Sequence, residues 1–292
     1  MGSINVSSKS KFVLTAEALN EALPKMHMTT KAIHADAFAS PHCAIAPGMH
    51  TAVNFRYARD PDDLLPEENK VKLDLTDVDQ AGPGGIIHVE TPLNPTGEAR
   101  NLAYFRAKAD EKGAYLTVDA TFAPPPLQDP LDSGADTVMH SGTEYIGGHS
   151  DMLCGLLVLR SDRVEQGWLK RLHKDRQYIG SVMGSFEGWL GIRSARTMQL
   201  WVMKQAETAQ KLARWLYTQV EDQKSSVGEV LSRVQHASIQ RDVMADGWLQ
   251  KQMPGGFGPV FSVWARDPDH ARRLPSRVFV FQHATSLGGW RA

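Results

Sequence analysis

The sequence predicts an α/β fold followed by a smaller α+β C-terminal domain, and three features support this. Short apolar runs of strand length recur between residues 86 and 160, separated by loops and one helical pattern. Continuous apolar runs are typical of parallel strands that are buried on both faces. Amphipathic helical patterns then replace the strands, and a mixture of strand and helix follows. We predict an N-terminal arm and extended segment in 1–60, a large α/β domain with a long connecting helix in 61–220 and an α+β domain in 221–292.

The predicted elements of the first half follow from apolar runs and their end signals. Thr15 is a candidate N-cap for a short helix over 15–23. Buried strands are predicted at 86–90, 114–119, 137–140 and 154–160, because each is a short apolar run bounded by turn residues. A helix before Gly113 connects the first two of these strands. Strand, helix and strand in this order predict parallel βαβ units.

Helices dominate the second half. One amphipathic helix is predicted over 161–175 and a long one over 194–220. We expect three tryptophans of this half, Trp189, Trp201 and Trp215, to be core residues on helices. The C-terminal part predicts a strand in FGPVFSVWA (257–265), a short helix around ARRL (271–274) and a further apolar segment over 278–290.

Composition excludes several classes of function. The 292 residues carry a net charge of −1, so nothing favours binding to nucleic acid or to an anionic membrane. No apolar stretch approaches the roughly 20 residues that span a bilayer, and residues 1–11 do not resemble a signal peptide. The two cysteines, Cys43 and Cys154, indicate reduced thiols and a cytoplasmic location.

Polar side chains follow three of the predicted strands. Glu90 ends the first, Asp119 ends the second, and Ser141, Thr143 and Glu144 follow the third. Ligands of open α/β sheets bind at the carboxyl ends of the strands, so we expect these residues to converge. Asp119 follows a buried run and needs a cationic or N–H partner. Hydroxyls on both sides of Gly142 are suited to a phosphate group.

A metal site is not predicted. His140, His149 and Asp151 lie close together in the sequence, but their spacing matches no compact zinc pattern. The paired glycines at 84–85 and 147–148 match no dinucleotide or P-loop motif.

Two motifs resemble a known family. ETPLNPTGEARNL (90–102) and VDATFAPPPLQDPLDSGADTVMHSGTEYIGGHSD (118–151) are similar to the Cys/Met-metabolism enzymes that depend on pyridoxal phosphate (PLP), and most to fungal cystathionine γ-synthase/γ-lyase-like proteins. The resemblance extends over most of 29–66 and 71–289. It implies a large PLP-transferase-like domain of the aspartate aminotransferase type (fold type I), a smaller C-terminal domain, a homodimer or homotetramer, and elimination or replacement chemistry on a small-molecule substrate.

The resemblance also implies roles for individual residues. Asp119 resembles the partner of the cofactor's pyridinium nitrogen. Ser141 and Thr143 resemble the phosphate-binding pair. Asn94 resembles a residue near the cofactor's phenolic oxygen and the substrate carboxylate, and Ser286 resembles a residue of the substrate carboxylate site.

The chain departs from the family pattern in three respects. Glu144 stands where the family has its Schiff-base lysine, and a carboxylate cannot form an imine. The family's segment between RYARDPDD (56–63) and KLDLTDVD (72–79) is mostly absent, as is the family's stretch beyond SLGG (286–289). The fold therefore looks incomplete. Two explanations stay open: the sequence covers only part of a longer chain, or the protein is truly reduced.

Three functions follow from these observations. The first is a PLP-independent acid–base enzyme, in which Glu144 and Asp119 are catalytic in a decarboxylation, isomerisation or cyclisation; the competing interpretation of Glu144 is an exposed loop charge. The second is a PLP-dependent γ-synthase or γ-lyase acting on homoserine esters or cystathionine, seen as a lysine-to-glutamate variant whose cofactor is absent or bound non-covalently. The third is a non-catalytic pseudoenzyme that partners another subunit.

Overall fold

The structure is a computed structural model that describes residues 16–26, 81–222, 224–240, 247–278, 281 and 284. The chain divides into two units, Met1–His50 and Thr51–Ala292. In the first unit, α1 (Ala16–Ala22) leads into the 3-10 turn η1 (Leu23–Lys25), which confirms the predicted short helix. The predicted extended segment before residue 61 lies outside the described residues, and so does most of the apolar segment 278–290. The three-domain division stays a prediction.

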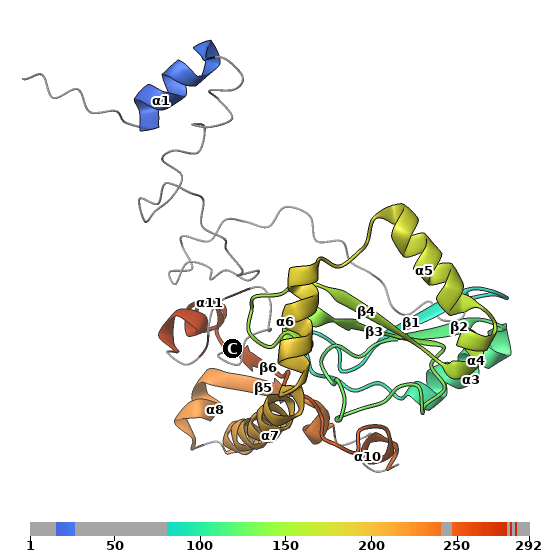
Figure 1. The fold of residues 1–292 in the computed structure, drawn as a ribbon. Coiled ribbons are helices and arrows are strands. Elements are labelled where there is room, and N and C mark those ends of the chain that lie inside the picture. Colours follow the sequence, from blue (N-terminus) through green and yellow to red (C-terminus); the bar gives the residue numbers. More distant parts are fainter. Residues whose placement is uncertain are drawn as a thin grey trace, which may run out of the picture. The chain divides into compact units, whose positions relative to one another are not determined.

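A four-stranded sheet organises the second unit. Its strands β1 (Ile86–Glu90), β2 (Tyr115–Asp119), β3 (Thr137–Ser141) and β4 (Gly155–Leu159) lie side by side in chain order (Figure 1). β1, β2 and β3 are parallel, and their register places Glu90 beside Asp119 and Asp119 beside Met139. The predicted parallel α/β layer is therefore confirmed for the first three strands.

Helix α3 (Leu102–Lys112) connects β1 to β2 and covers one face of them. Asn101 caps its first turn by accepting hydrogen bonds from the amides of Ala103 and Tyr104. Gly113 ends it in the left-handed conformation, with φ of 64°, as the sequence predicts. The apolar core beneath the helix consists of Ile87, Val89, Leu102, Ala109, Ala114, Leu116, Val118, Ala120, Ala135 and Val138.

Strand β4 differs from its prediction in direction and in burial. It runs antiparallel to β3, and Leu157 and Val158 are 57% and 42% exposed. The apolar run GLLVL predicted a strand buried on both faces, which is wrong. These two consecutive residues, Leu157 and Val158, point to opposite faces, so the described residues leave both faces of β4 partly uncovered at this last strand of the sheet.

Two predicted helices are each interrupted. The segment 161–175 contains α4 (Ser161–Glu165) and the start of α5 (Trp168–Ile179), because Gly167 adopts a left-handed conformation with φ of 87°. The long helix begins at Met198 as α7 (Met198–Glu221), and a separate helix α6 (Ser185–Ala195) precedes it. Figure 1 shows α6 crossing one end of the sheet before the chain enters α7.

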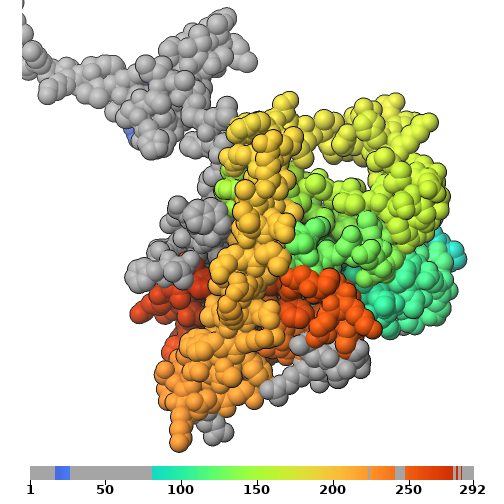
Figure 2. All heavy atoms as spheres, turned by 60° about the horizontal axis from the view of Figure 1, so that its bottom comes forward, coloured from blue at the N-terminus to red at the C-terminus, as the bar shows by residue number. Residues whose placement is uncertain are grey.

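The tryptophans do not share one environment. Trp201 packs against the core and donates its indole N–H to the Tyr145 carbonyl at 3.1 Å. Trp189 and Trp215 are 59% and 51% exposed, so the prediction that they are core residues is wrong. In the view of Figure 2, the helices from α5 to α7 lie at the surface of the molecule. Helical periodicity places these rings on one face of each helix, but it does not show what covers that face.

The C-terminal part forms a second, smaller sheet. β5 (Leu231–Gln235) pairs antiparallel with β6 (Ser262–Ala265). α7 and α8 (Ser226–Val230) pack against β5, and α11 (Pro268–Arg277) packs against β6. The 3-10 turn η5 (Ala237–Ile239) and α10 (Trp248–Gln252) complete this part of the chain. The helix predicted near 271–274 and the strand predicted in 257–265 are confirmed. Among the described residues, none of the helices combines the length and apolar character needed to cross a membrane.

Side chains of the C-terminal part share a core with the loops that follow β1 and β2. This core consists of Ala99, Phe122, Ala123, Leu127, Tyr145, Val202, Ala206, Ala237, Leu249, Met253 and Val260. Gln252 of α10 adds a buried polar link, because its Oε1 accepts from the Leu102 amide and its Nε2 donates to the Arg100 carbonyl. The contacts fix the loops at the carboxyl ends of the parallel strands, where the predicted site residues lie.

Candidate functional site

The predicted convergence of polar side chains is confirmed. Glu90, Asp119 and Ser141 are the last residues of three adjacent strands, so they lie along one edge of the sheet. Burial raises the pKa of Glu90 and the nearby Asp119 charge adds to this, while a hydrogen bond from the Asn94 amide opposes it. Two carboxylates on neighbouring strands make this edge electronegative and suited to a cationic or N–H group.

Asp119 has the N–H partner that its position predicts. Its Oδ1 accepts hydrogen bonds from the Thr121 amide at 2.9 Å and from the Thr121 hydroxyl at 2.6 Å. The side chain is half-buried. Within the described residues no hydrogen bond reaches its second oxygen, Oδ2, which leaves one acceptor available to a ligand.

The segment after β3 is a short π-helix, η4 (Gly142–Ile146), where a loop is predicted. Ser141 caps it, because its hydroxyl accepts from the Thr143 amide at 3.3 Å. The Thr143 side chain is 6% exposed, and its hydroxyl forms no hydrogen bond to the described part of the chain. Gly142 passes so close to the Cys154 thiol that a Cβ atom there would overlap it. The two hydroxyls are thus held on a tightly packed turn.

Glu144 lies in the second position of η4 and is half-buried, with its Oε2 enclosed. It is therefore not the fully exposed loop charge of the competing interpretation. Burial raises the pKa of the Tyr145 hydroxyl and of the Cys154 thiol, and the Glu144 charge raises both further. The sequence contains no lysine between Lys112 and Lys170, so no amine stands in this segment.

The residues considered for metal binding have separate partners. His149 contacts the Gly147 carbonyl at 2.7 Å, and Asp151 pairs with Arg193 at 2.9 Å. His140 is 6% exposed; burial lowers its pKa, and the Asp119 charge partly opposes that change. In the part of the chain that the structure describes, no group of three histidine, cysteine or carboxylate side chains could hold a metal ion.

Of the two residues predicted to contact substrate, the structure describes only Asn94. Asn94 is exposed on the loop after β1, and its amide donates to Glu90 Oε1 at 3.1 Å, which places it beside the site. Ser286 lies outside the described residues. Sequence analysis missed Thr121, although an aspartate followed two residues later by a hydroxyl residue is a known pattern for a local side-chain turn.

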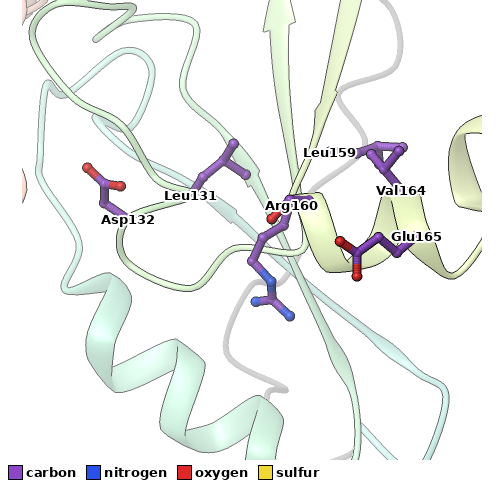
Figure 3. Close-up of a pocket in the computed structure, with 7 residues that line it drawn as sticks. Leu131, Asp132, Leu159, Arg160, Val164 and Glu165 are labelled. Atoms are coloured by element: carbon purple, nitrogen blue, oxygen red, sulfur yellow. The ribbon is translucent and has the colours of Figure 1, made fainter.

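The opposite end of the sheet carries a shallow, open pocket of about 660 Å³. Figure 3 shows Leu131, Asp132, Leu159, Arg160, Val164 and Glu165 around it. Beside it, the fully buried Asp136 pairs with Arg106, Arg160 and Arg163 at 2.8 to 3.0 Å. These charges already satisfy one another, so this end does not resemble a ligand site.

Solved structures with the same fold define the class of protein. The chain matches a methionine gamma lyase from Micromonospora echinospora with a TM-score of 0.58 and 31% identity, over 70% of this chain and 52% of that one. It matches a cystathionine gamma synthase from Xanthomonas oryzae with a TM-score of 0.58 and 29% identity, over 70% of this chain and 49% of that one. The predicted fold class is confirmed: this is a fold type I protein of the PLP-transferase kind.

The family follows from the sequence comparison. The model of the Cys/Met metabolism PLP-dependent enzymes matches residues 75–292, and the chain belongs to this family. It is 45% identical over 78 residues to a cystathionine gamma-synthase/O-acetylhomoserine (thiol)-lyase of Bacillus subtilis, over 27% of this chain and 21% of that protein. It is 40% identical over 97 residues to a cystathionine gamma-synthase of Mycobacterium tuberculosis, over 32% of this chain and 25% of that protein. The chain thus spans about half of the solved structures and a quarter or less of these curated relatives.

Two finer predictions gain no support from these comparisons. The relatives named here are bacterial, so nothing in them favours the fungal assignment. The family is PLP-dependent, which favours the PLP-dependent alternative over the predicted PLP-independent acid–base enzyme.

Proposed function

We propose that this chain is a cystathionine γ-synthase/γ-lyase-like protein whose site binds PLP without a covalent link. We further propose that the site is shaped for small amino acids such as cystathionine and homoserine esters, which it would convert only once a lysine is restored. The observation that carries the proposal is the Asp119 carboxylate. It is oriented through Oδ1, keeps Oδ2 available, and lies one strand away from the hydroxyls of Ser141 and Thr143.

The residues present fit the cofactor's non-covalent contacts. Asp119 Oδ2 can accept from a protonated pyridine nitrogen, as in other PLP sites. Thr143 has a hydroxyl with no partner among the described residues, and Ser141 offers a second one; both suit a phosphate group. Bound PLP supplies an electron sink for reactions at amino acid carbon atoms. This chain's residues hold and orient it.

The residues do not fit covalent attachment. Glu144 stands at the position that resembles the family's lysine, and its carboxylate would lie near an anionic phosphate. Like charges at such a site oppose each other. We therefore expect weak, reversible cofactor binding and little or no elimination activity in the natural sequence. In this proposal Glu144 accounts for both properties.

Two substitutions of Glu144 test the proposal in the full chain. Glu144→Gln removes the charge and should tighten PLP binding about tenfold in equilibrium dialysis. Glu144→Lys should retain PLP after borohydride reduction, seen as a mass increase, and should gain activity on O-acetylhomoserine or cystathionine. Glu144→Gln should retain no PLP after the same reduction, because it has no lysine at this position to form the covalent link. Failure of the natural chain and of both variants to bind PLP would overturn the proposal.

A second candidate function is favoured by the apolar surface of α5 to α7. Four large apolar side chains of these helices are each more than half exposed: Ile179, Trp189, Ile192 and Leu200. Several exposed apolar side chains on neighbouring helices indicate an interaction surface more than single ones do. A non-catalytic subunit that pairs with another protein of the same fold would cover this surface. Size-exclusion chromatography with light scattering tests this function. A stable monomer, both alone and when mixed with an intact family member, would count against it.

A further inference from the structure

Thr121 connects two residues of the proposed PLP site through a single hydroxyl. This residue is 5% exposed and lies two positions after Asp119, the last residue of β2. Its Oγ1 donates to Asp119 Oδ1 at 2.6 Å and accepts from the Ser141 amide at 2.8 Å. Its own amide also donates to Asp119 Oδ1, at 2.9 Å. The ends of β2 and β3 are therefore joined at this residue.

The direction of these hydrogen bonds is fixed by their chemistry. A threonine hydroxyl has one proton, and the Ser141 amide can only donate to it. The hydroxyl proton must then point to Asp119, whose Oδ1 receives two donors on the same side. Hydrogen bonds to an ionised acceptor are short and strong, which agrees with the 2.6 Å separation. The outcome is a carboxylate with a fixed orientation and one available oxygen.

We infer that Thr121 is a positioning residue for the cofactor: it holds the ring-nitrogen partner Asp119 in a fixed relation to the phosphate-binding turn that begins at Ser141. This inference rests on the proposed function, because it assigns Thr121 a role in the same site. Thr121 itself need not touch the ligand. Its effect reaches the ligand through Asp119 Oδ2 on one strand and through the Ser141–Thr143 turn on the next.

A matched control lies on β2, the strand that precedes Thr121. Thr117 is on the same face of β2 as Asp119, and its hydroxyl bonds to His88 Nδ1 at 2.8 Å, in the middle of the strands and away from their ends. Thr117→Val therefore removes one threonine hydroxyl contact from the sheet without touching the proposed site. Thr121→Val removes the hydroxyl with nearly unchanged volume, and Thr121→Ser keeps the hydroxyl and removes only the methyl group.

The experiment measures PLP affinity by equilibrium dialysis together with urea unfolding of each full-length variant. We expect Thr121→Val to weaken PLP binding about tenfold, with Thr121→Ser and Thr117→Val within about twofold of the natural chain. In an Asp119→Asn background, Thr121→Val should have almost no additional effect on affinity, because the oriented carboxylate is gone. If Thr121→Val does not fold, Thr121→Ala is measured in its place.

The outcomes separate the two proposals. If the natural chain binds PLP and Thr121→Val binds equally well, the positioning role is wrong and the proposed function stands. Equal losses of affinity in Thr121→Val and Thr117→Val would also overturn it, since they would indicate a general effect on the sheet. If the natural chain binds no PLP, both the proposed function and the role of Thr121 fail.

Discussion

Asp119 and Asp136 lie at opposite ends of the same sheet and have opposite surroundings. Asp136 is fully buried, and its oxygens contact three arginines and the Leu116 amide. Asp119 is half-buried, its carboxylate forms hydrogen bonds only with Thr121 within the described residues, and it lies beside a second carboxylate residue, Glu90, on the neighbouring strand. A carboxylate whose oxygens are all satisfied stabilises the fold, whereas one with an available oxygen at a sheet edge can bind a ligand. The contrast explains why only one end is proposed as a site.

The largest expected effect is at Asp136. Removing one partner of a buried ion pair leaves uncompensated charge, so Asp136→Asn should lower the free energy of unfolding by about 3–5 kcal/mol. Urea unfolding measures this, with Asp132→Asn as an exposed control that should change little. A loss below about 1 kcal/mol would mean that the arginines find other partners and that Asp136 is not the structural aspartate.

The same residue should govern stability in acid. Burial alone would raise the pKa of Asp136, but the Leu116 amide and the guanidinium groups of Arg163 and Arg106 hold it below its ordinary 3.8. A lowered folded-state pKa gives stability that is present above 3.8 and is lost as pH falls through the folded value. Asp136→Asn should remove this loss, which unfolding curves across that range would reveal.

The next effect concerns Asp119. Asp119→Asn keeps the size of the side chain but removes the charge that a protonated ring nitrogen needs. PLP affinity should fall about tenfold, roughly 1.4 kcal/mol of binding free energy, while the free energy of unfolding changes by less than about 1 kcal/mol. Equilibrium dialysis and urea unfolding together check this. A large decrease in the free energy of unfolding would show that Asp119, like Asp136, mainly stabilises the fold.

The smallest effect is at Glu90. Its pKa is raised above the ordinary 4.5, first by burial, so its ionisation costs stability as pH rises through the folded value. Glu90→Gln should therefore stabilise the chain at pH 7 by roughly 0.2–1 kcal/mol, the range for like charges on neighbouring strands. The gain should vanish below the unfolded-state pKa. A destabilised variant at pH 7 would show that the Asn94 hydrogen bond outweighs the repulsion.

Sequence reasoning predicted the parallel part of the fold well and the surface poorly. The strand ends at Glu90, Asp119 and Ser141 could be placed because apolar runs end sharply at polar residues. The exposure of Leu157 and Trp189 could not be predicted, because burial depends on what neighbouring segments cover. The breaks at Gly167 and before Met198 interrupt helices without changing the apolar period. The contact of Thr121 with Asp119 is local and could have been predicted, but its contact with the Ser141 amide joins residues 20 positions apart and could not.

The uncharged edge of β4 has a practical consequence for handling this protein. Residues 155–159 contain no charge and no proline, the two features that usually prevent an edge strand from pairing with other chains. Concentrated preparations should consequently form particles over time, which dynamic light scattering would detect. Leu157→Lys puts a charge on this edge, at an exposed position, and should slow that growth while leaving PLP binding as it was.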